Sequence, residues 1–166
     1  MKNTHILYGF LTALAIIIIN VILYITNNAF HTWSQYVSYV PLLIGLILNA
    51  NAFSKANDEG VTFGKLFSSC YKACAIITIV VIAWSFIAVA IFPDMVDKAM
   101  EAAKERMMEK GNVSQEQLDQ GIAMMQKGFK LLMVIGVIVM YIVFGALLSL
   151  VAAAIAKKKP ATTMPY

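Results

Sequence analysis

The strongest pattern along the chain is a set of four long apolar segments separated by polar links. These segments cover residues 6–24, 36–53, 73–92 and 131–156. An α-helix rises 1.5 Å per residue, so segments of this length can cross a hydrocarbon core of about 30 Å. The pattern predicts an all-α, polytopic membrane protein with four transmembrane helices, which form a single membrane domain over residues 1–166.

The third apolar segment is preceded by a stretch that alternates apolar and polar side chains at helical spacing. Around residues 63–72, apolar side chains recur at spacings of three and four at Phe63, Leu66, Cys70 and Cys74, with Lys65 and Lys72 between them. We expect an amphipathic lead-in helix at the membrane surface. A lysine within a span is a functional hypothesis by default. Lys72, however, lies just before the core and can extend its stem to the surface, so we interpret it as an interface anchor.

The link between the third and fourth spans is also amphipathic. Pro93 is suited to a helix start, and residues 114–117 form a capping-box pattern that opens a second helix. Residues 93–128 therefore predict an extramembrane helical hairpin, whose apolar side must rest on lipid, on itself or on a partner. Six of the ten methionines fall here, and we take the apolar positions as the candidate interaction surface: Met95, Met100, Met107, Leu118, Ile122 and Met125.

The distribution of lysine and arginine predicts the orientation. The first link, residues 26–35, has no basic residue, whereas the second contains Lys55 and Lys65. Basic residues favour the cytoplasmic side and aromatic residues the interface. We therefore expect cytoplasmic N- and C-termini, a basic cytoplasmic tail over residues 157–166 and a hairpin on the outer face. The expected interface anchors, besides Lys72, are Trp33, Lys157, Lys158 and Lys159.

Composition supports a membrane environment. Hydrophobic residues make up 60% of the 166 positions and charged residues 13%, against about 25% charged residues in soluble domains. Membrane lipid is thus an expected partner. The net charge of +4 owes much to the basic tail, so it does not predict a nucleic-acid partner.

Candidate chemistry is sparse. His5 and His31 are the only histidines, and the expected topology separates them across the membrane. We predict no catalytic residue, no cofactor and no metal site, and hence no enzyme. The small and polar residues of the spans are expected to allow close helix packing or to form hydrogen bonds between helices. They are Gly145, Ser149, Ala153, Asn20 and Asn49.

Several short motifs in order resemble an uncharacterised family of four-span membrane proteins typical of Bacteroidetes, the DUF4199 family. They are Tyr8-Gly9-Phe10, the stretch from Asp58 to Lys65, Phe92-Pro93-Asp94, and the Glu/Met-rich region from Glu101 to Phe129. The resemblance implies a bacterial inner membrane, so the outer face would be periplasmic. It implies no activity and no functional residues.

We therefore expect a non-enzymatic accessory or scaffold subunit that binds a partner or the membrane surface through the hairpin. The alternative is a subunit of a small oligomeric transporter or channel. Because four helices enclose little volume, that alternative needs a homo-oligomer packed through small-residue stripes such as Gly145/Ser149/Ala153.

Overall fold

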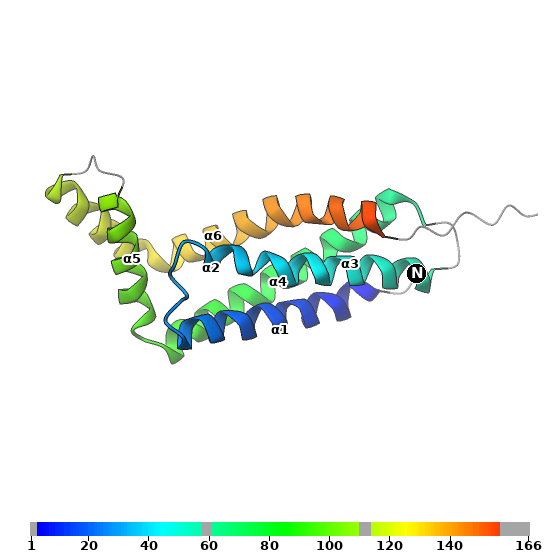
Figure 1. Ribbon diagram of the computed structural model, residues 1–166, viewed down its shortest axis with the longest axis horizontal. Helices are drawn as coiled ribbons and strands as arrows, with labels where there is room; N and C mark the ends of the chain where they lie inside the picture. The colour runs from blue at the N-terminus through cyan, green and yellow to red at the C-terminus, as the bar shows by residue number, and fades with distance from the viewer. Residues whose placement is uncertain (1–2, 58–60, 110–113, 157–166) are drawn as a thin grey trace, which may run out of the picture.

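The computed structural model describes residues 3–57, 61–109 and 114–156, in which the regular elements are helices (Figure 1). In chain order the helices are α1 (Thr4–Ile25), α2 (Ser34–Val37), α3 (Tyr39–Ala56), α4 (Phe63–Ile91), α5 (Met95–Glu109) and α6 (Gln115–Ile155). Helices α1, α3, α4 and α6 are long and apolar enough to cross a membrane. The predicted all-α membrane fold with four spans is confirmed.

Two of the spans are longer than a membrane crossing needs. Helix α4 has 29 residues and contains both the predicted lead-in and the span without a break. Its start is defined by Thr62, whose hydroxyl accepts a hydrogen bond from the Lys65 amide. Helix α6 has 41 residues and begins with the predicted capping box between Ser114 and Gln117. The fourth span therefore continues beyond the bundle as one helix.

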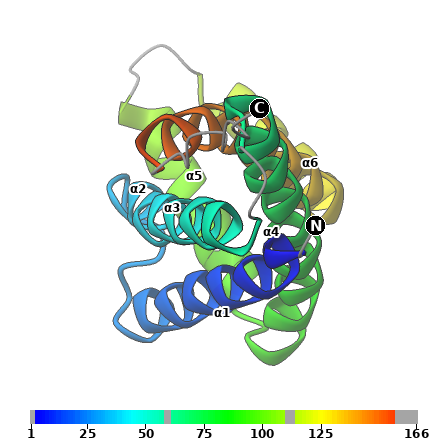
Figure 2. The same ribbon diagram turned by 90° about the vertical axis from the view of Figure 1, so that its right-hand side faces the viewer.

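Helices α1 and α6 are the outer pair of the bundle, and each packs against both α3 and α4 (Figure 2). Small residues allow the closest approaches. A Cβ atom added to Gly45 of α3 would collide with Thr12 Oγ1 of α1 and lie 2.7 Å from Thr12 Cγ2. A Cβ atom added to Gly145 of α6 would lie 3.1 Å from Cys74 Sγ of α4. The helices thus meet at positions where a larger side chain would separate them.

The outward faces of the bundle are apolar. On α1 they present a row of exposed aliphatic side chains at helical spacing: Leu7, Leu11, Leu14, Ile18 and Ile22. On α6 a similar row runs along the span: Leu131, Ile135, Val139, Ile142 and Leu147. In water such a surface is unfavourable, whereas in a bilayer it contacts lipid chains.

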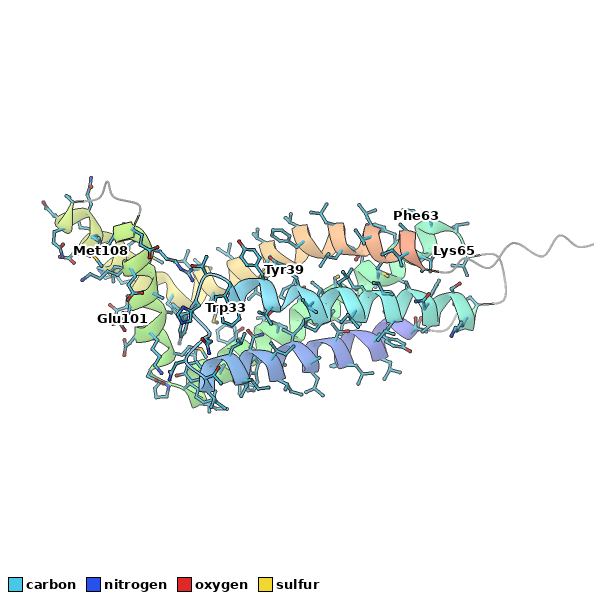
Figure 3. All side chains as sticks on the ribbon, viewed as in Figure 1. Trp33, Tyr39, Phe63, Lys65, Glu101 and Met108 are labelled. Atoms are coloured by element: carbon cyan, nitrogen blue, oxygen red, sulfur yellow. The ribbon has the colours of Figure 1, made fainter. Side chains whose placement is uncertain are left out.

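Helix α5 and the first turns of α6 extend past one end of the bundle, as Figures 1 and 3 show. The opposite end carries the start of α1 and the start of α4 near Phe63 and Lys65 (Figure 3). The two ends therefore differ in build. One carries an extra pair of helical segments, and the other carries the basic lead-in of α4.

Candidate functional site

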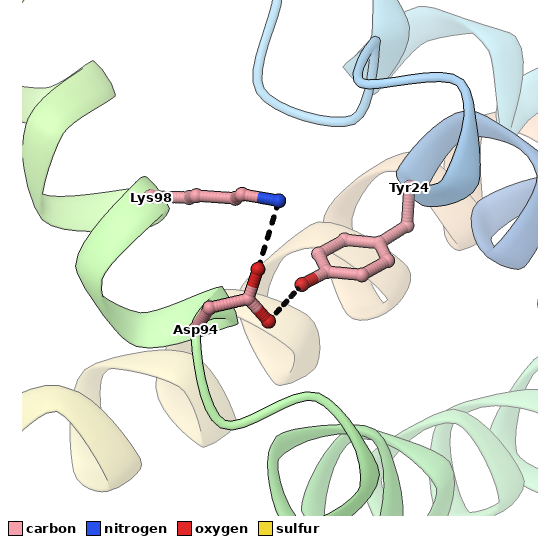
Figure 4. A network of polar contacts seen from close by, with 3 residues as sticks. All are labelled: Tyr24, Asp94 and Lys98. Carbon is pink, nitrogen blue, oxygen red and sulfur yellow. Dashed lines mark hydrogen bonds and ion pairs between the residues drawn. The ribbon is translucent and has the colours of Figure 1, made fainter.

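The base of α5 is joined to the end of α1 by a three-residue polar network (Figure 4). Tyr24 donates its hydroxyl hydrogen to Asp94 Oδ1 over 2.5 Å, and Lys98 Nζ lies 2.8 Å from Asp94 Oδ2. Lys98 also lies 5.0 Å from the centre of the Tyr24 ring. Because Asp94 directly precedes α5 and Lys98 lies four residues later, the pair also stabilises the helix start.

In this network Asp94 and Lys98 each stabilise the ionised form of the other. The hydrogen bond from Lys98, followed by that from Tyr24, lowers the pKa of the Asp94 carboxyl below its ordinary value. The same bond to Asp94 raises the pKa of Lys98 above its ordinary value. Asp94 and Lys98 therefore stay ionised over a wide pH range, although their side chains are 55% and 40% exposed.

A second contact holds α5 to the link between α1 and α2. Arg106 Nη2 donates a hydrogen bond to the carbonyl oxygen of Phe30 over 2.7 Å. Within the link, the Ser34 hydroxyl bonds to the carbonyl oxygens of Asn28 and His31. The Phe30 ring packs edge-on to Tyr24, with ring centres 6.5 Å apart. The base of α5 is thus attached to the end of α1, and its last turns are attached to the loop that follows α1.

A pocket of about 260 Å³ lies between this loop and α5; we call it the link pocket. Its wall carries Lys98 together with Glu101 and Glu105. Mixed charges of this kind do not select one sign of ligand. The remaining lining residues come from the end of α1, the loop and α5: Tyr24, Asn27, Ala29, Phe30, His31 and Ala102.

The predicted interaction residues lie mainly in the contact between α5 and the start of α6. Met100 is only 9% exposed and Leu118 only 2%. Met107 Cε would lie 3.2 Å from a Cβ atom added to Gly121, so the two helices approach closely here. Met95, Met107, Ile122 and Met125 are half-buried. The apolar stripe therefore rests largely on itself, which removes Met100 and Leu118 from the surface open to a partner.

Two methionines outside that stripe remain exposed. Met108 is 52% exposed and Met124 is 74% exposed. The helical periodicity of apolar positions does not place them in the candidate interaction surface, because both fall beside the apolar stripe. A sequence rule that looks for apolar side chains off the packing face would have found them.

The small and polar residues of the spans are buried within one chain. Ser149 and Ala153 are fully buried, and Cys74 Sγ lies 3.6 Å from Ser149 Oγ. The stripe formed with Gly145 faces α4 and is not open to a second subunit. Asn49 is fully buried and bonds to Thr4 and Ser69. Asn20 is exposed and bonds to the Ile16 carbonyl oxygen of its own helix and to Ser38.

Two of the predicted interface anchors, Trp33 and Lys72, are among the described residues. Trp33 is 52% exposed and stacks near His31, with ring centres 6.4 Å apart. Lys72 is exposed on α4. Lys157, Lys158 and Lys159 lie outside the described residues. Within the described ranges, no group of three His, Cys, Asp or Glu side chains could hold a metal ion. Cys70 and Cys74 are buried free thiols.

Comparison with known proteins gives one match. The model of a family described as a protein of unknown function, DUF4199, matches residues 7–158. No curated protein and no solved structure matches the chain.

Proposed function

Because the chain belongs to the DUF4199 family of unknown function, we propose a role from its own geometry. It is a non-enzymatic integral membrane protein that acts as an accessory or scaffold subunit. It binds a partner through the extramembrane hairpin, that is, α5 and the part of α6 before residue 129. The proposal concerns the exposed outer surface of this hairpin, since the inner surface packs on itself.

One observation carries the proposal: Met108 and Met124 are exposed on the two helices of the hairpin. Hydrogen bonds join the base of α5 to Tyr24 of α1, and Arg106 to the loop after α1. Flexible thioether side chains on a fixed support suit an adaptable apolar contact. A fixed support also lowers the entropy cost of binding.

The charge of the hairpin favours a protein partner over a membrane surface. Acidic side chains outnumber basic ones on its exposed faces, whereas bacterial and other anionic membranes repel acids. In the described part of residues 93–128 the acidic residues are Asp94, Asp97, Glu101, Glu105, Glu109, Glu116 and Asp119, and the basic residues are Lys98, Lys104, Arg106 and Lys127.

Photo-crosslinking in intact cells tests this function. A diazirine amino acid at position 108 or 124 is expected to give a discrete protein adduct that is absent at position 139, a lipid-facing site on α6. With the diazirine amino acid at position 108, the further substitution Met124→Glu should remove the adduct. With it at position 124, Met108→Glu should do the same. Adducts with lipid alone, or the same products at all three positions, would contradict a protein-binding hairpin.

For the localisation we propose the bacterial inner membrane, with both termini cytoplasmic and the hairpin periplasmic. The support is the lack of Lys and Arg in residues 26–35 and their presence at Lys55, Lys65 and the tail. Reporter fusions after Lys104 and after Lys55 test the orientation. Periplasmic activity is expected for the first and cytoplasmic activity for the second, and the reverse result would refute it.

A further inference from the structure

At the end of the bundle that carries the start of α4, helices α1, α3 and α4 enclose a second pocket of about 530 Å³, which we call the basic pocket. Lys65, labelled in Figure 3, lies at this end, opposite the end with Met108 and Glu101. The pocket is lined by Asn3 and His5 near the start of α1, Phe53 of α3, and Thr62, Gly64, Lys65, Ser68, Ser69 and Lys72 around the start of α4.

Among the described residues that line the basic pocket, the charged side chains are lysines. Lys65 and Lys72 are seven residues apart, so they share a face of α4, with Ser68 and Ser69 between them on the same face. His5 reaches the pocket from α1. No acidic side chain is among the described residues that line it. Such a site attracts an anion.

A chain of hydrogen bonds between helices ends at Ser69, one of the residues that line the pocket. Thr4 Oγ1 donates to Asn49 Oδ1 over 2.9 Å, and Asn49 Nδ2 donates to Ser69 Oγ over 3.2 Å. Ser69 is 3% exposed, and its oxygen is occupied as an acceptor from Asn49. Its own hydroxyl hydrogen bonds to no other described residue, so it can be donated to a ligand in the pocket. Bonds in such a chain polarise one another, which strengthens the donor at its end.

We propose that the basic pocket binds a phosphate group, either in the headgroup of an anionic phospholipid or as free phosphate. A tetrahedral oxyanion accepts several hydrogen bonds at once, and this pocket offers two ammonium groups, an imidazole and hydroxyl groups from Ser68 and Ser69. The pocket lies at the end of four membrane helices, where lipid headgroups are found. This site is separate from the hairpin and does not depend on the function proposed for it.

An alternative explanation is that the two lysines only anchor the helix end at the interface. Surface anchors attract any anionic lipid weakly and without saturation. A built site binds one phosphate with a defined stoichiometry and depends on Ser69 as well as on the lysines. The two explanations therefore differ in a measurable way.

The test uses the full-length protein in mild detergent, with ligand binding followed by native mass spectrometry. The probes are short-chain phosphatidylglycerol, diacylglycerol with the same acyl chains, and inorganic phosphate. The variants are Lys65→Gln, Lys72→Gln and Ser69→Ala. Lys55→Gln is the matched control, since Lys55 is exposed near the same end but does not line the pocket.

One phosphate-bearing ligand per chain is expected, with affinity about tenfold lower in Lys65→Gln or Lys72→Gln. Ser69→Ala should also weaken binding, and Lys55→Gln should leave it unchanged. Binding of phosphatidylglycerol alone identifies a lipid site, and binding of inorganic phosphate with the same sensitivity identifies free phosphate. Equal binding of diacylglycerol, or an equal loss in Lys55→Gln, would overturn the proposal.

Discussion

The Tyr24 hydroxyl donates a hydrogen bond to Oδ1 of Asp94 over 2.5 Å, which joins the last turn of α1 to the residue before α5. The two residues are 70 positions apart in the chain. This contact fixes where the hairpin leaves the bundle. It therefore determines how Met108 and Met124 are presented.

Replacing Tyr24 by Phe keeps the ring, and with it the contact to Phe92 at 4.6 Å, but removes the hydrogen bond. Amide exchange across residues 95–109 should become faster, by about two- to fivefold for a contact of this exposure. Hydrogen–deuterium exchange with mass spectrometry measures this. Tyr36→Phe is the control, because Tyr36 is 60% exposed and its ring contact is to Tyr39 of α3. Unchanged exchange in Tyr24→Phe would show that the contact does not hold α5.

The docking of α5 should depend on pH only under strongly acidic and strongly alkaline conditions. The Asp94 pKa is lowered when α5 is docked, so its contribution is complete above the ordinary carboxyl value of 3.8 and is lost as the pH falls through the lowered pKa. The Lys98 pKa is raised, so its contribution is complete below 10.5 and lost above the raised pKa. Exchange of α5, corrected for intrinsic rates, should be constant from about pH 5 to pH 9.

The Asp94→Asn variant checks the assignment of this acid response. It should show faster exchange of α5 at neutral pH and no further loss of docking at acidic pH, since the titrating group is gone. A variant that keeps the acid response would place the responsible carboxyl elsewhere.

Gly45→Ala should destabilise the bundle by about 1–3 kcal/mol, as overpacking does in well-packed interiors. The reason is the collision of the new methyl group with Thr12 on α1. Thermal unfolding in detergent gives the measurement. Gly136→Ala is the control, because nothing lies within 4 Å of its added Cβ, and it should be neutral or slightly stabilising. Thr12→Ala in the Gly45→Ala background should restore part of the loss; no restoration would exclude this collision as the cause.

Asn49→Ala should lower the free energy of unfolding by about 1 kcal/mol, which is typical of a hydrogen bond between membrane helices. It leaves Thr4 and the buried Ser69 without their shared partner. Asn20→Ala should cost less, because Asn20 is exposed and one of its bonds is to its own helix. Comparing the thermal unfolding of the two variants tests this order, and equal losses would contradict it.

The spans were predictable because periodicity and hydropathy are local properties. The start of α4 near Phe63 and the capping box at Ser114 could likewise be placed from neighbouring residues alone. The hairpin surface was less predictable. An apolar stripe containing Met100 and Leu118 requires burial, but the pattern cannot say whether lipid, a partner or the other half of the hairpin covers it.

The two pockets illustrate the same limit. His5 and Lys72 line one pocket, and Tyr24 and Glu101 line the other, although each pair is distant in the chain. No spacing rule connects such residues, since their separation depends on how the helices pack. The shared face of Lys65, Ser68, Ser69 and Lys72 was visible in the sequence, but the partner helices were not.

The amino-acid sequence by itself determined that this chain forms four apolar membrane helices with an amphipathic lead-in and an amphipathic third link. These properties follow from side-chain hydrophobicity and from a helical period of 3.6 residues, both of which act locally. Only the tertiary structure decided which faces are covered, because close approaches such as Gly45 to Thr12 set the packing of the helices. That packing buried Met100, left Met108 exposed, and brought His5 into one pocket with two lysines.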